Sequence, residues 1–245
     1  MFKWNTQEVI EDLRIKYPKA KIVYHVNEVN IGPDKNFLKA VSISSGEYCW
    51  LFGSDDKVAD GAVKRVLDQI DLKCTVYISD RYNADCKNMS ILEIQRFFSP
   101  ELTQDYVFEI CDQEDWSFYL SKCRALGALF SYISSVVFSK KDWDKILEEM
   151  YFPYVWTAYV HVAILLLTIK NNERSTIKYL HDPIVINRTG NDSFFQNIYQ
   201  RTMLDFDGYI KLSEIFAENQ FTKAAVRYIL KHEHSIDNMK WPPRM

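Results

Sequence analysis

The chain has 245 residues, of which 47% are hydrophobic and 26% are charged, and its formal net charge is −3. This length and hydrophobic content suffice for one sizeable folded domain or two small ones. A net charge so close to zero, with both signs mixed along the chain, provides no basic surface for nucleic acid. We therefore exclude a nucleic-acid partner.

Five cysteines are scattered along the chain, and no two have the spacing of metal ligands. Free thiols in a reducing compartment explain this pattern, and a polar helical segment follows Met1 where a signal peptide would be apolar. We therefore expect a cytoplasmic protein. The uncharged stretch Tyr154–Ile169 is short for a membrane-spanning helix and contains His161. It predicts a buried helix, with an interfacial helix as the alternative.

The first third of the chain alternates between helical and strand patterns. Apolar residues at helical spacing predict helices at 6–17, 34–44 and 59–70, and β-branched or apolar runs predict strands at 21–26, 48–52 and 75–79. The run at 48–52 is continuously apolar, as expected for a strand buried on both faces of a parallel sheet. The alternation indicates an α/β fold.

The pattern changes after about residue 90. It predicts helices around 101–111, 114–125, 140–150 and 156–170, strands at 132–139, 177–180 and 184–187, and helices from about 193 to 235. We therefore expect an α/β domain over residues 1–190 and a helical extension over residues 191–245 that packs on it.

Two adjacent carboxylates, Asp55 and Asp56, follow the apolar strand at 48–52 after Gly53-Ser54. In open α/β sheets, ligands bind outside the carboxyl ends of the strands, so these groups are candidates for a binding site. Taken alone, such a pair is more often a solvated start of a helix, where carboxylates complement the helix dipole. The earlier Asn30-Ile31-Gly32 is, by itself, an ordinary turn sequence.

Taken together, the motifs have a fixed order: Asn30-x-Gly32, then Asn36, Ala40, Gly46-Glu47-Tyr48, an apolar strand and Asp55-Asp56. This order resembles that of the inverting family 2 glycosyltransferases of the GT-A type. The segment GEYCWLFGSDD resembles the corresponding segment of their abequosyltransferase-like branch. The resemblance covers residues 6–80 well and 127–143 and 188–192 more loosely. It implies a partial GT-A (Rossmann-like) mixed sheet flanked by helices, with a mostly helical C-terminal region.

The resemblance also implies a reaction and its site. A sugar would pass from a nucleotide-diphosphate donor to an acceptor hydroxyl, in bacterial surface polysaccharide or glycolipid synthesis. Asp55 and Asp56 would bind Mn²⁺ or Mg²⁺, which stabilises the departing diphosphate. Gly53 stands where many relatives carry a first aspartate. The donor would be bound by Asn30, Gly32, Lys35, Asn36 and Ser54.

An inverting transfer needs a base that takes the proton of the acceptor hydroxyl. The family's acidic residue has no clear counterpart here, and His161 is the candidate by its ordinary pKa. A single histidine on an apolar helix is, however, more often a core residue. Trp156, Arg188 and Asn191 are candidates for binding acceptor or phosphate. For Arg188 and Asn191, a surface turn explains the sequence equally well.

Relatives begin with two further strands, which in the family's sheet lie between the counterparts of Lys21–Val26 and Tyr48–Phe52. Without them a gap of about 14 Å would separate these two segments. We therefore expect the two segments to pair directly or the region to be poorly ordered, and nucleotide-sugar binding to be weak or absent. The alternative function is a catalytically incompetent fragment or pseudo-enzyme that acts as a binding module.

Family-level partners are a nucleotide-diphosphate sugar and a lipid-linked or saccharide acceptor. A lipid acceptor would fit a cytoplasmic protein that contacts the inner membrane face peripherally through an aromatic-rich apolar surface. A second copy of the chain is a further candidate partner.

Overall fold

The computed structural model describes residues 5–189 and 198–234, in two compact units, residues 1–32 and 33–245. In the smaller unit, α1 (Thr6–Lys16) begins at the N-cap Asn5 and buries none of its side chains. Residues 21–26, predicted as a strand, have no regular secondary structure, and Val23 and Val26 are more than 60% exposed. The strand prediction is wrong, because a β-branched run without a neighbouring strand has no partner for its backbone groups.

The larger unit contains a five-stranded mixed sheet in the order β1-β7-β3-β8-β6. Its strands are β1 (Tyr48–Trp50), β3 (Val76–Ser79), β6 (Tyr106–Ile110), β7 (Val136–Ser139) and β8 (Ser175–Leu180). Strands β1, β3 and β8 run in one direction, whereas β7 and β6 run in the other. The carboxyl ends of β1, β3 and β8 therefore meet at the same edge of this sheet.

β1 is an edge strand with β7 as its partner among the described residues. Of the two alternatives expected for this region, direct pairing with residues 21–26 is not among the strand pairs of the described residues. The prediction that this strand is buried on both faces of a parallel sheet is wrong. Its neighbour is antiparallel, and only Cys49 is buried while Tyr48 and Trp50 are half-buried.

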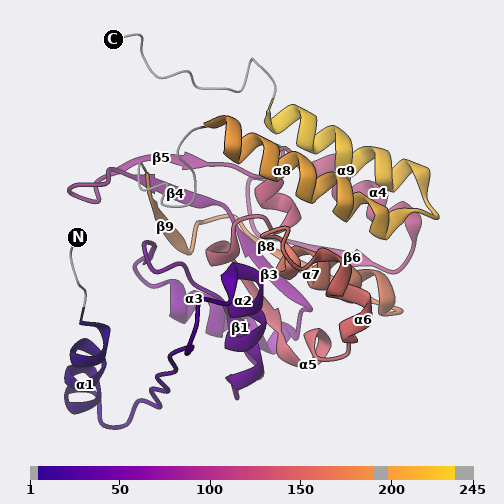
Figure 1. Ribbon diagram of the computed structural model, residues 1–245. Helices are drawn as coiled ribbons and strands as arrows, with labels where there is room; N and C mark the ends of the chain where they lie inside the picture. Colours follow the sequence, from indigo (N-terminus) through magenta and orange to yellow (C-terminus); the bar gives the residue numbers. More distant parts are fainter. Residues whose placement is uncertain (1–4, 190–197, 235–245) are drawn as a thin grey trace. The chain divides into compact units, whose positions relative to one another are not determined.

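A second, four-stranded sheet has the order β2-β9-β4-β5. It consists of β2 (Lys57–Val58), β4 (Arg81–Ala84), β5 (Ile91–Gln95) and β9 (Val185–Arg188). Each of the three co-directional strands of the first sheet leads into this one, since β1 is followed by β2, β3 by β4 and β8 by β9 (Figure 1). The three connections, residues 51–56, Asp80 and 181–184, form what we call the seam between the sheets.

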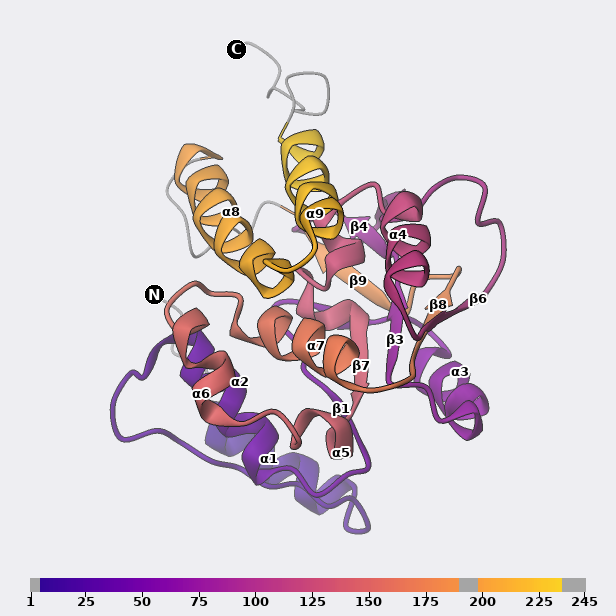
Figure 2. The same ribbon diagram turned by 90° about the vertical axis from the view of Figure 1, so that its right-hand side faces the viewer.

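Helices cover both faces of the five-stranded sheet (Figure 2). The α-helices of the larger unit are α2 (Gly32–Ile43), α3 (Ala62–Gln69), α4 (Gln113–Lys122), α5 (Lys140–Trp143), α6 (Glu148–Tyr151), α7 (Val160–Asn171), α8 (Ile198–Ser213) and α9 (Gln220–Glu233). Short 3-10 helices lie at Ile70–Leu72, Leu126–Leu129, Ile133–Ser135, Phe152–Tyr154 and Glu214–Phe216. The fold is thus α/β with a helical C-terminal part, as the sequence predicted.

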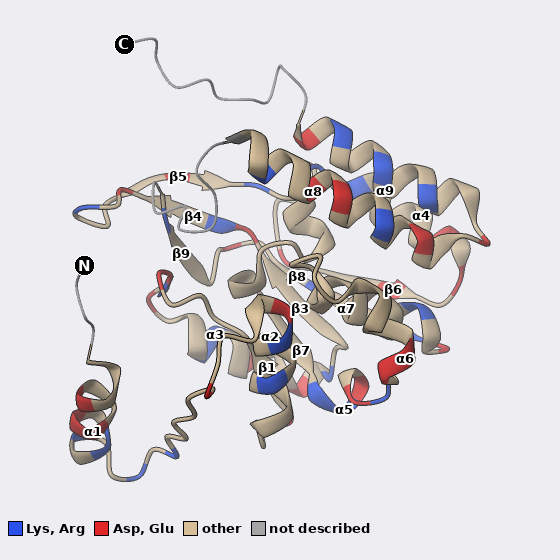
Figure 3. Cartoon of the chain, in the orientation of Figure 1, with Lys and Arg blue, Asp and Glu red and all other residues tan. Residues whose placement is uncertain are grey.

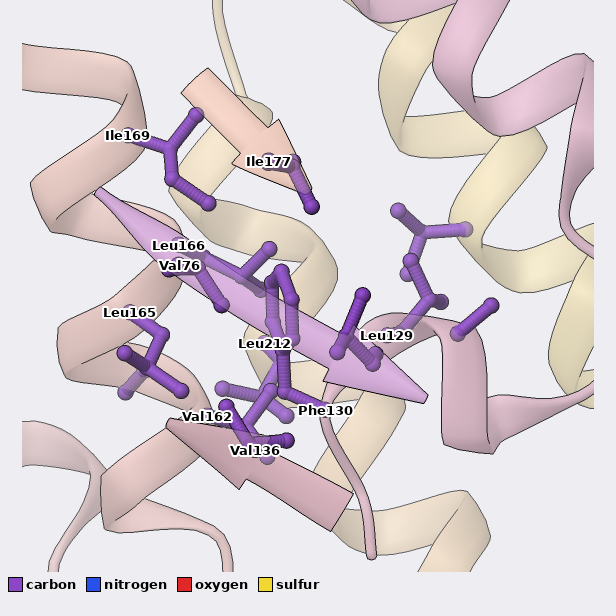
Figure 4. Close-up of a cluster of buried hydrophobic side chains, with 14 of the residues drawn as sticks. Val76, Leu129, Phe130, Val136, Val162, Leu165, Leu166, Ile169, Ile177 and Leu212 are labelled. Atoms are coloured by element: carbon purple, nitrogen blue, oxygen red, sulfur yellow. The ribbon is translucent and has the colours of Figure 1, made fainter. Parts of the chain in front are cut away.

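The larger of two apolar cores lies on the α7 face of the sheet (Figure 4). There, alternate residues of β3, β7 and β8 meet α7 and α8: Val76, Val136, Ile177, Val162, Leu166 and Leu212. The opposite face packs on α3 through Tyr77, Val137 and Val66. Because both faces of the central strands are covered, β3 is buried at every position.

Helix α7 begins within the uncharged stretch of the sequence and includes its residues 160–169, and these ten of its twelve residues are buried. This confirms the prediction of a buried helix. Among the described residues, no helix combines the length and the apolar character that crossing a membrane requires. Gly208 of α8 lets this region pack closely, because a Cβ there would come within 2.5 Å of the Tyr159 ring.

Several segments of the larger unit differ from the sequence-based expectation. The helix predicted at 101–111 is wrong, since Tyr106–Ile110 is strand β6, paired with β8. Tertiary pairing overrides the local pattern there. The strand predicted at 132–139 is shortened to β7 by a 3-10 turn at Ile133–Ser135, and the helix predicted at 140–150 is divided into α5 and α6. Strands β4 and β5 were not predicted.

Acidic and basic residues are interspersed on the outer helices α5, α8 and α9 (Figure 3). Surface ion pairs such as Lys140–Asp144 and Arg227–Glu214 connect basic with acidic side chains. This mixture agrees with the small net charge of the chain.

Asp80 connects the two sheets at the seam. Its carboxylate is fully buried and accepts hydrogen bonds from the Phe97 amide (2.7 Å), the Tyr179 hydroxyl (2.6 Å) and the Arg96 guanidinium (2.8 Å). These donors come from β8 and from the segment around β5, so a single side chain ties together three parts of the fold.

We expect Asp80→Ala to lower the free energy of unfolding by about 3 kcal/mol, because it leaves buried donors without an acceptor. Urea denaturation followed by circular dichroism measures this loss. Asp68→Ala is the matched control, since Asp68 pairs with Lys64 on an exposed helix face and should cost about 0.5 kcal/mol or less. Equal losses in the two variants would contradict the assignment.

Candidate active site

The two carboxylates predicted to bind a metal converge over Gly53. A Cβ placed on Gly53 would lie 2.8 Å from Asp56 Oδ2 and 3.0 Å from Asp55 Oδ1. The two oxygens therefore flank one small space, and a side chain at position 53 would fill it. This gives a physical reason for a glycine at this position.

Asp56 is fixed by two hydroxyl groups from the 3-10 turn that precedes β7. The Tyr132 hydroxyl donates to Asp56 Oδ1 and the Ser134 hydroxyl to Oδ2, each at 2.6 Å. The Gly53 amide in turn donates to Ser134 Oγ (2.8 Å), and Trp50 Nε1 donates to the Ser134 carbonyl (2.8 Å). The turn thus holds both the backbone and the side chain of the acidic loop.

Burial raises the pKa of Asp56 above its ordinary value, while the hydrogen bonds from Ser134 and Tyr132 partly oppose this. The nearby charge of Asp55 also raises the pKa of Asp56, whereas the Arg81 guanidinium lowers it. Two like charges held together in a partly buried loop favour the binding of a cation.

The residues fit a hard divalent cation such as Mn²⁺ or Mg²⁺. Such ions are bound by a few carboxylate oxygens together with phosphate oxygens and water. Among the described residues, no group of three or more His, Cys, Asp or Glu side chains could hold a metal by itself. Asp55 and Asp56 would therefore share the ion with the phosphates of a ligand.

Lys35 and Trp156, far apart in the sequence, lie together. The Lys35 ammonium is 4.8 Å from the centre of the Trp156 ring, which is 67% exposed. Trp156 has φ 78° and Ala158 has φ 65°, conformations that are strained for residues with a side chain. The exposed ring is thus held in a strained loop before α7.

The buried Asp34 carboxylate stabilises this loop. It accepts hydrogen bonds from the Ala158 amide (3.0 Å) and the Val160 amide (3.2 Å), at the start of α7. Burial raises the pKa of Asp34, and the loop amides oppose that rise. Helix α2, which carries Lys35, is therefore fastened to the loop that carries Trp156.

The other predicted site residues lie in a turn or at exposed positions. In the smaller unit, Asn30 Oδ1 accepts from the Gly32 amide (2.9 Å) and Gly32 has φ 76°, as in a tight turn. Asn36, Ser54 and Arg188 are exposed, with Arg188 at the end of β9. Asn191 lies outside the described residues.

His161, the candidate base, is 3% exposed on α7, where its ring contacts Phe37 edge-on at 5.3 Å. Burial lowers its pKa to about 4, which the carbonyl groups of Phe130 and Ser131 partly oppose. Neither ring nitrogen has hydrogen-bond geometry with a described residue. This environment favours the alternative of a core histidine.

Sequence reasoning did not single out Asp34, Arg81, Tyr132 or Ser134. Tyr132 and Ser134 were read as part of a strand, and only their position across from the acidic loop gives them a role. Asp34 was visible within the motif Asn30–Asn36, but its partners lie more than 120 residues away.

Protonation of His161 should destabilise the fold at acidic pH. Because the folded-state pKa lies below the ordinary 6.5, stability is full above pH 6.5 and falls as the pH drops towards about 4. The loss should reach roughly 3 kcal/mol. Denaturant titrations across this range measure it, with His161→Leu as the comparison. If the variant keeps the same pH dependence between 6.5 and 4, another group is responsible.

Comparisons with known proteins show the family to which the chain belongs. Residues 3–131 match the model of glycosyl transferase family 2. The chain is also similar to the abequosyltransferase RfbV of Salmonella typhimurium, with 35% identity over 230 residues, which are 93% of this chain and 67% of the relative. Both the resemblance seen in the sequence motifs and the α/β architecture agree with these matches. The chain therefore belongs to glycosyl transferase family 2 and is a glycosyltransferase of the abequosyltransferase type.

Proposed function

We propose that this glycosyltransferase moves a sugar from a nucleotide-diphosphate donor to an acceptor hydroxyl, with inversion and with a divalent cation. The acceptor would be a saccharide or a lipid-linked saccharide of a bacterial surface polysaccharide or glycolipid. The observation that carries the proposal is the convergence of Asp55 and Asp56 over Gly53 at the carboxyl end of β1. The abequosyltransferase relative supports the substrate class.

The chemistry depends on the charge that leaves with the donor diphosphate. Asp55 and Asp56 would hold Mn²⁺ or Mg²⁺, which when bound neutralises that charge as it develops. Tyr132 and Ser134 keep the Asp56 carboxylate oriented before the donor arrives. Such preorganisation lowers the cost of reorienting groups during the reaction.

The exposed Trp156 ring provides a flat apolar face beside the Lys35 ammonium. We assign this pair to the sugar acceptor or to its phosphate, because rings pack against sugar faces and ammonium groups attract phosphate. We assign no proton transfer to His161, since its ring is enclosed in the core and its pKa is about 4.

A lipid-linked acceptor would place the reaction at a membrane surface. The protein would then approach its acceptor from the cytoplasmic side through peripheral contact. The alternative is a binding module without catalysis. A folded chain that neither transfers sugar nor binds nucleoside diphosphates would support it.

Loss of the Asp55 carboxylate should abolish the metal-dependent step. We expect Asp55→Asn to lower the transfer rate about a hundredfold or more, because charge stabilisation of the leaving group is lost. The measurement is release of nucleoside diphosphate from a panel of nucleotide sugars with Mn²⁺. Asp60→Asn, an exposed carboxylate after β2, is the control and should retain activity. Full activity of the wild-type protein in EDTA would refute the proposal.

A methyl group on Gly53 provides a second, independent test. Gly53 does not have positive φ, so alanine changes only the space between the two carboxylates. We expect Gly53→Ala to weaken Mn²⁺-dependent binding of nucleoside diphosphates about tenfold with little change in melting temperature. Calorimetric titration measures the affinity, and an unchanged Kd would argue against an ion between these oxygens.

Substitution of Trp156 by glycine tests the aromatic ring, because it removes the ring and also relieves the backbone strain at this position. Trp156→Gly removes the Lys35 contact but relieves the positive φ, so the two effects on stability should offset each other to within about 1 kcal/mol. We expect the KM for the acceptor to rise about tenfold, while the KM for the donor stays unchanged. Trp156→Tyr should restore acceptor binding, and Phe152→Ala, another exposed aromatic residue, is the control. An unchanged acceptor KM in Trp156→Gly would exclude the ring from the site.

A further inference from the structure

Arg81 is the first residue of β4 and follows Asp80 at the seam, at the same sheet edge as the acidic loop. Its guanidinium lies over the Tyr132 ring, with Cζ 4.2 Å from the ring centre. Gln95, the residue of β5 that pairs with Arg81, also holds the guanidinium. Arg81 Nε (3.0 Å) and Nη2 (2.7 Å) both donate to Gln95 Oε1. The side chain is therefore held in one orientation.

Tyr132 links this guanidinium to the acidic loop. Its ring carries Arg81 and its hydroxyl donates to Asp56 (2.6 Å). A cation, an aromatic ring and a carboxylate thus follow one another across a short distance. The guanidinium lies close enough to Asp56 to lower the pKa of that carboxyl.

The charge of Arg81 has no ion-pair partner within the described part of the chain. Its hydrogen-bond acceptor Gln95 is neutral, and Asp56 already accepts from Tyr132 and Ser134. Glu233, which also acts on Arg81 through its charge, accepts from the Leu126 amide (2.8 Å). Burial lowers the pKa of Arg81, while Tyr132, Asp56 and Glu233 partly oppose this.

A second guanidinium lies in the same region. Arg201 of α8 pairs with the buried Asp205 (3.1 Å) and donates to the Tyr159 hydroxyl (3.3 Å). Its positive charge is near enough to lower the pKa of Arg81 by repulsion. Like charges that the fold holds near one another are stabilised when an anion binds between or beside them.

We propose that Arg81, held flat against Tyr132 beside the metal-binding loop, binds a phosphate group of a substrate diphosphate, and that Tyr132 and Gln95 position it for this contact. This inference rests on the proposed transfer from a nucleotide-diphosphate sugar. A guanidinium presents donors in a plane that matches two phosphate oxygens, and Gln95 accepts only from Nε and Nη2 of Arg81. The phosphate comes either from the donor or from a lipid-diphosphate acceptor.

Calorimetric titration of the full chain distinguishes these sources. The donor probe is a panel of UDP, CDP and GDP with Mn²⁺, and the acceptor probe is farnesyl diphosphate, a soluble lipid diphosphate. We expect Arg81→Gln to weaken binding of one probe about tenfold or more, and Arg81→Lys to recover only part of that loss. Weakening of the nucleotides assigns Arg81 to the donor, and weakening of farnesyl diphosphate assigns it to the acceptor.

Arg174→Gln is the matched control, because Arg174 pairs with Glu109 on the surface and precedes β8, at the opposite edge of the sheet. Thermal unfolding of each variant shows that it is folded before its affinity is compared. As a second readout, guanidinium chloride at millimolar concentration should restore part of the binding to Arg81→Ala but not to Asp55→Ala.

The outcomes separate this inference from the proposed function. If folded Arg81→Gln binds both probes as tightly as the wild-type protein, the role of Arg81 is refuted, whatever Asp55→Ala does. If Asp55→Ala leaves Mn²⁺-dependent binding unchanged while Arg81→Gln weakens it, the metal assignment fails and the phosphate contact stands. If Arg174→Gln also loses binding, the loss in Arg81→Gln reflects only the change in net charge, and the inference is overturned.

Discussion

The constraint on which the site depends is that three co-directional strands of one sheet all continue into a second sheet. Strands β1, β3 and β8 end at the same edge, and their continuations must cross the seam between the sheets. Backbone and side-chain polar groups that meet there cannot pair within either sheet. They are satisfied instead by side chains from other elements, such as Asp80 with Tyr179 and Asp56 with Tyr132. The seam is therefore one polar part of a largely apolar interior.

Two neighbouring residues at the seam, Asp80 and Arg81, carry charges with different roles, one in stabilising the fold and one in binding. Asp80 is fully buried with three donors around it, so its charge is compensated within the described chain. Arg81 is fixed by a neutral amide and an aromatic ring, which orient the cation without neutralising it. A charge with an ion pair supports the architecture, whereas an oriented charge without an ion pair among the described residues can serve a ligand.

The loop before α7 illustrates a related division. Trp156 and Ala158 adopt strained backbone conformations, and the buried Asp34 carboxylate offsets that strain through two amides. The contact of Asp34 of α2 with the loop thus holds the exposed Trp156 ring in place, and α2 also carries Lys35, which contacts this ring. Strain that surrounding structure maintains in this way is typical of ligand-binding sites. The same loop leads into α7, whose first turn already lies in the core, so the exposed ring is attached to a rigid helix.

The amino-acid sequence by itself determined the α/β class, the central strands β3, β8 and β9, the buried helix α7 and the family, because each rests on local apolar patterns or on the order of short motifs. Pairing partners were decided by the tertiary structure. Residues 106–110 form a strand because they pair with β8. Residues 21–26 have no strand partner among the described residues and have no regular secondary structure. The same holds for the site. Asp55 and Asp56 could be named from their place after a strand, but Tyr132, Ser134 and Arg81 acquire a role only through contacts between residues about 50 to 80 positions apart, which no local pattern encodes.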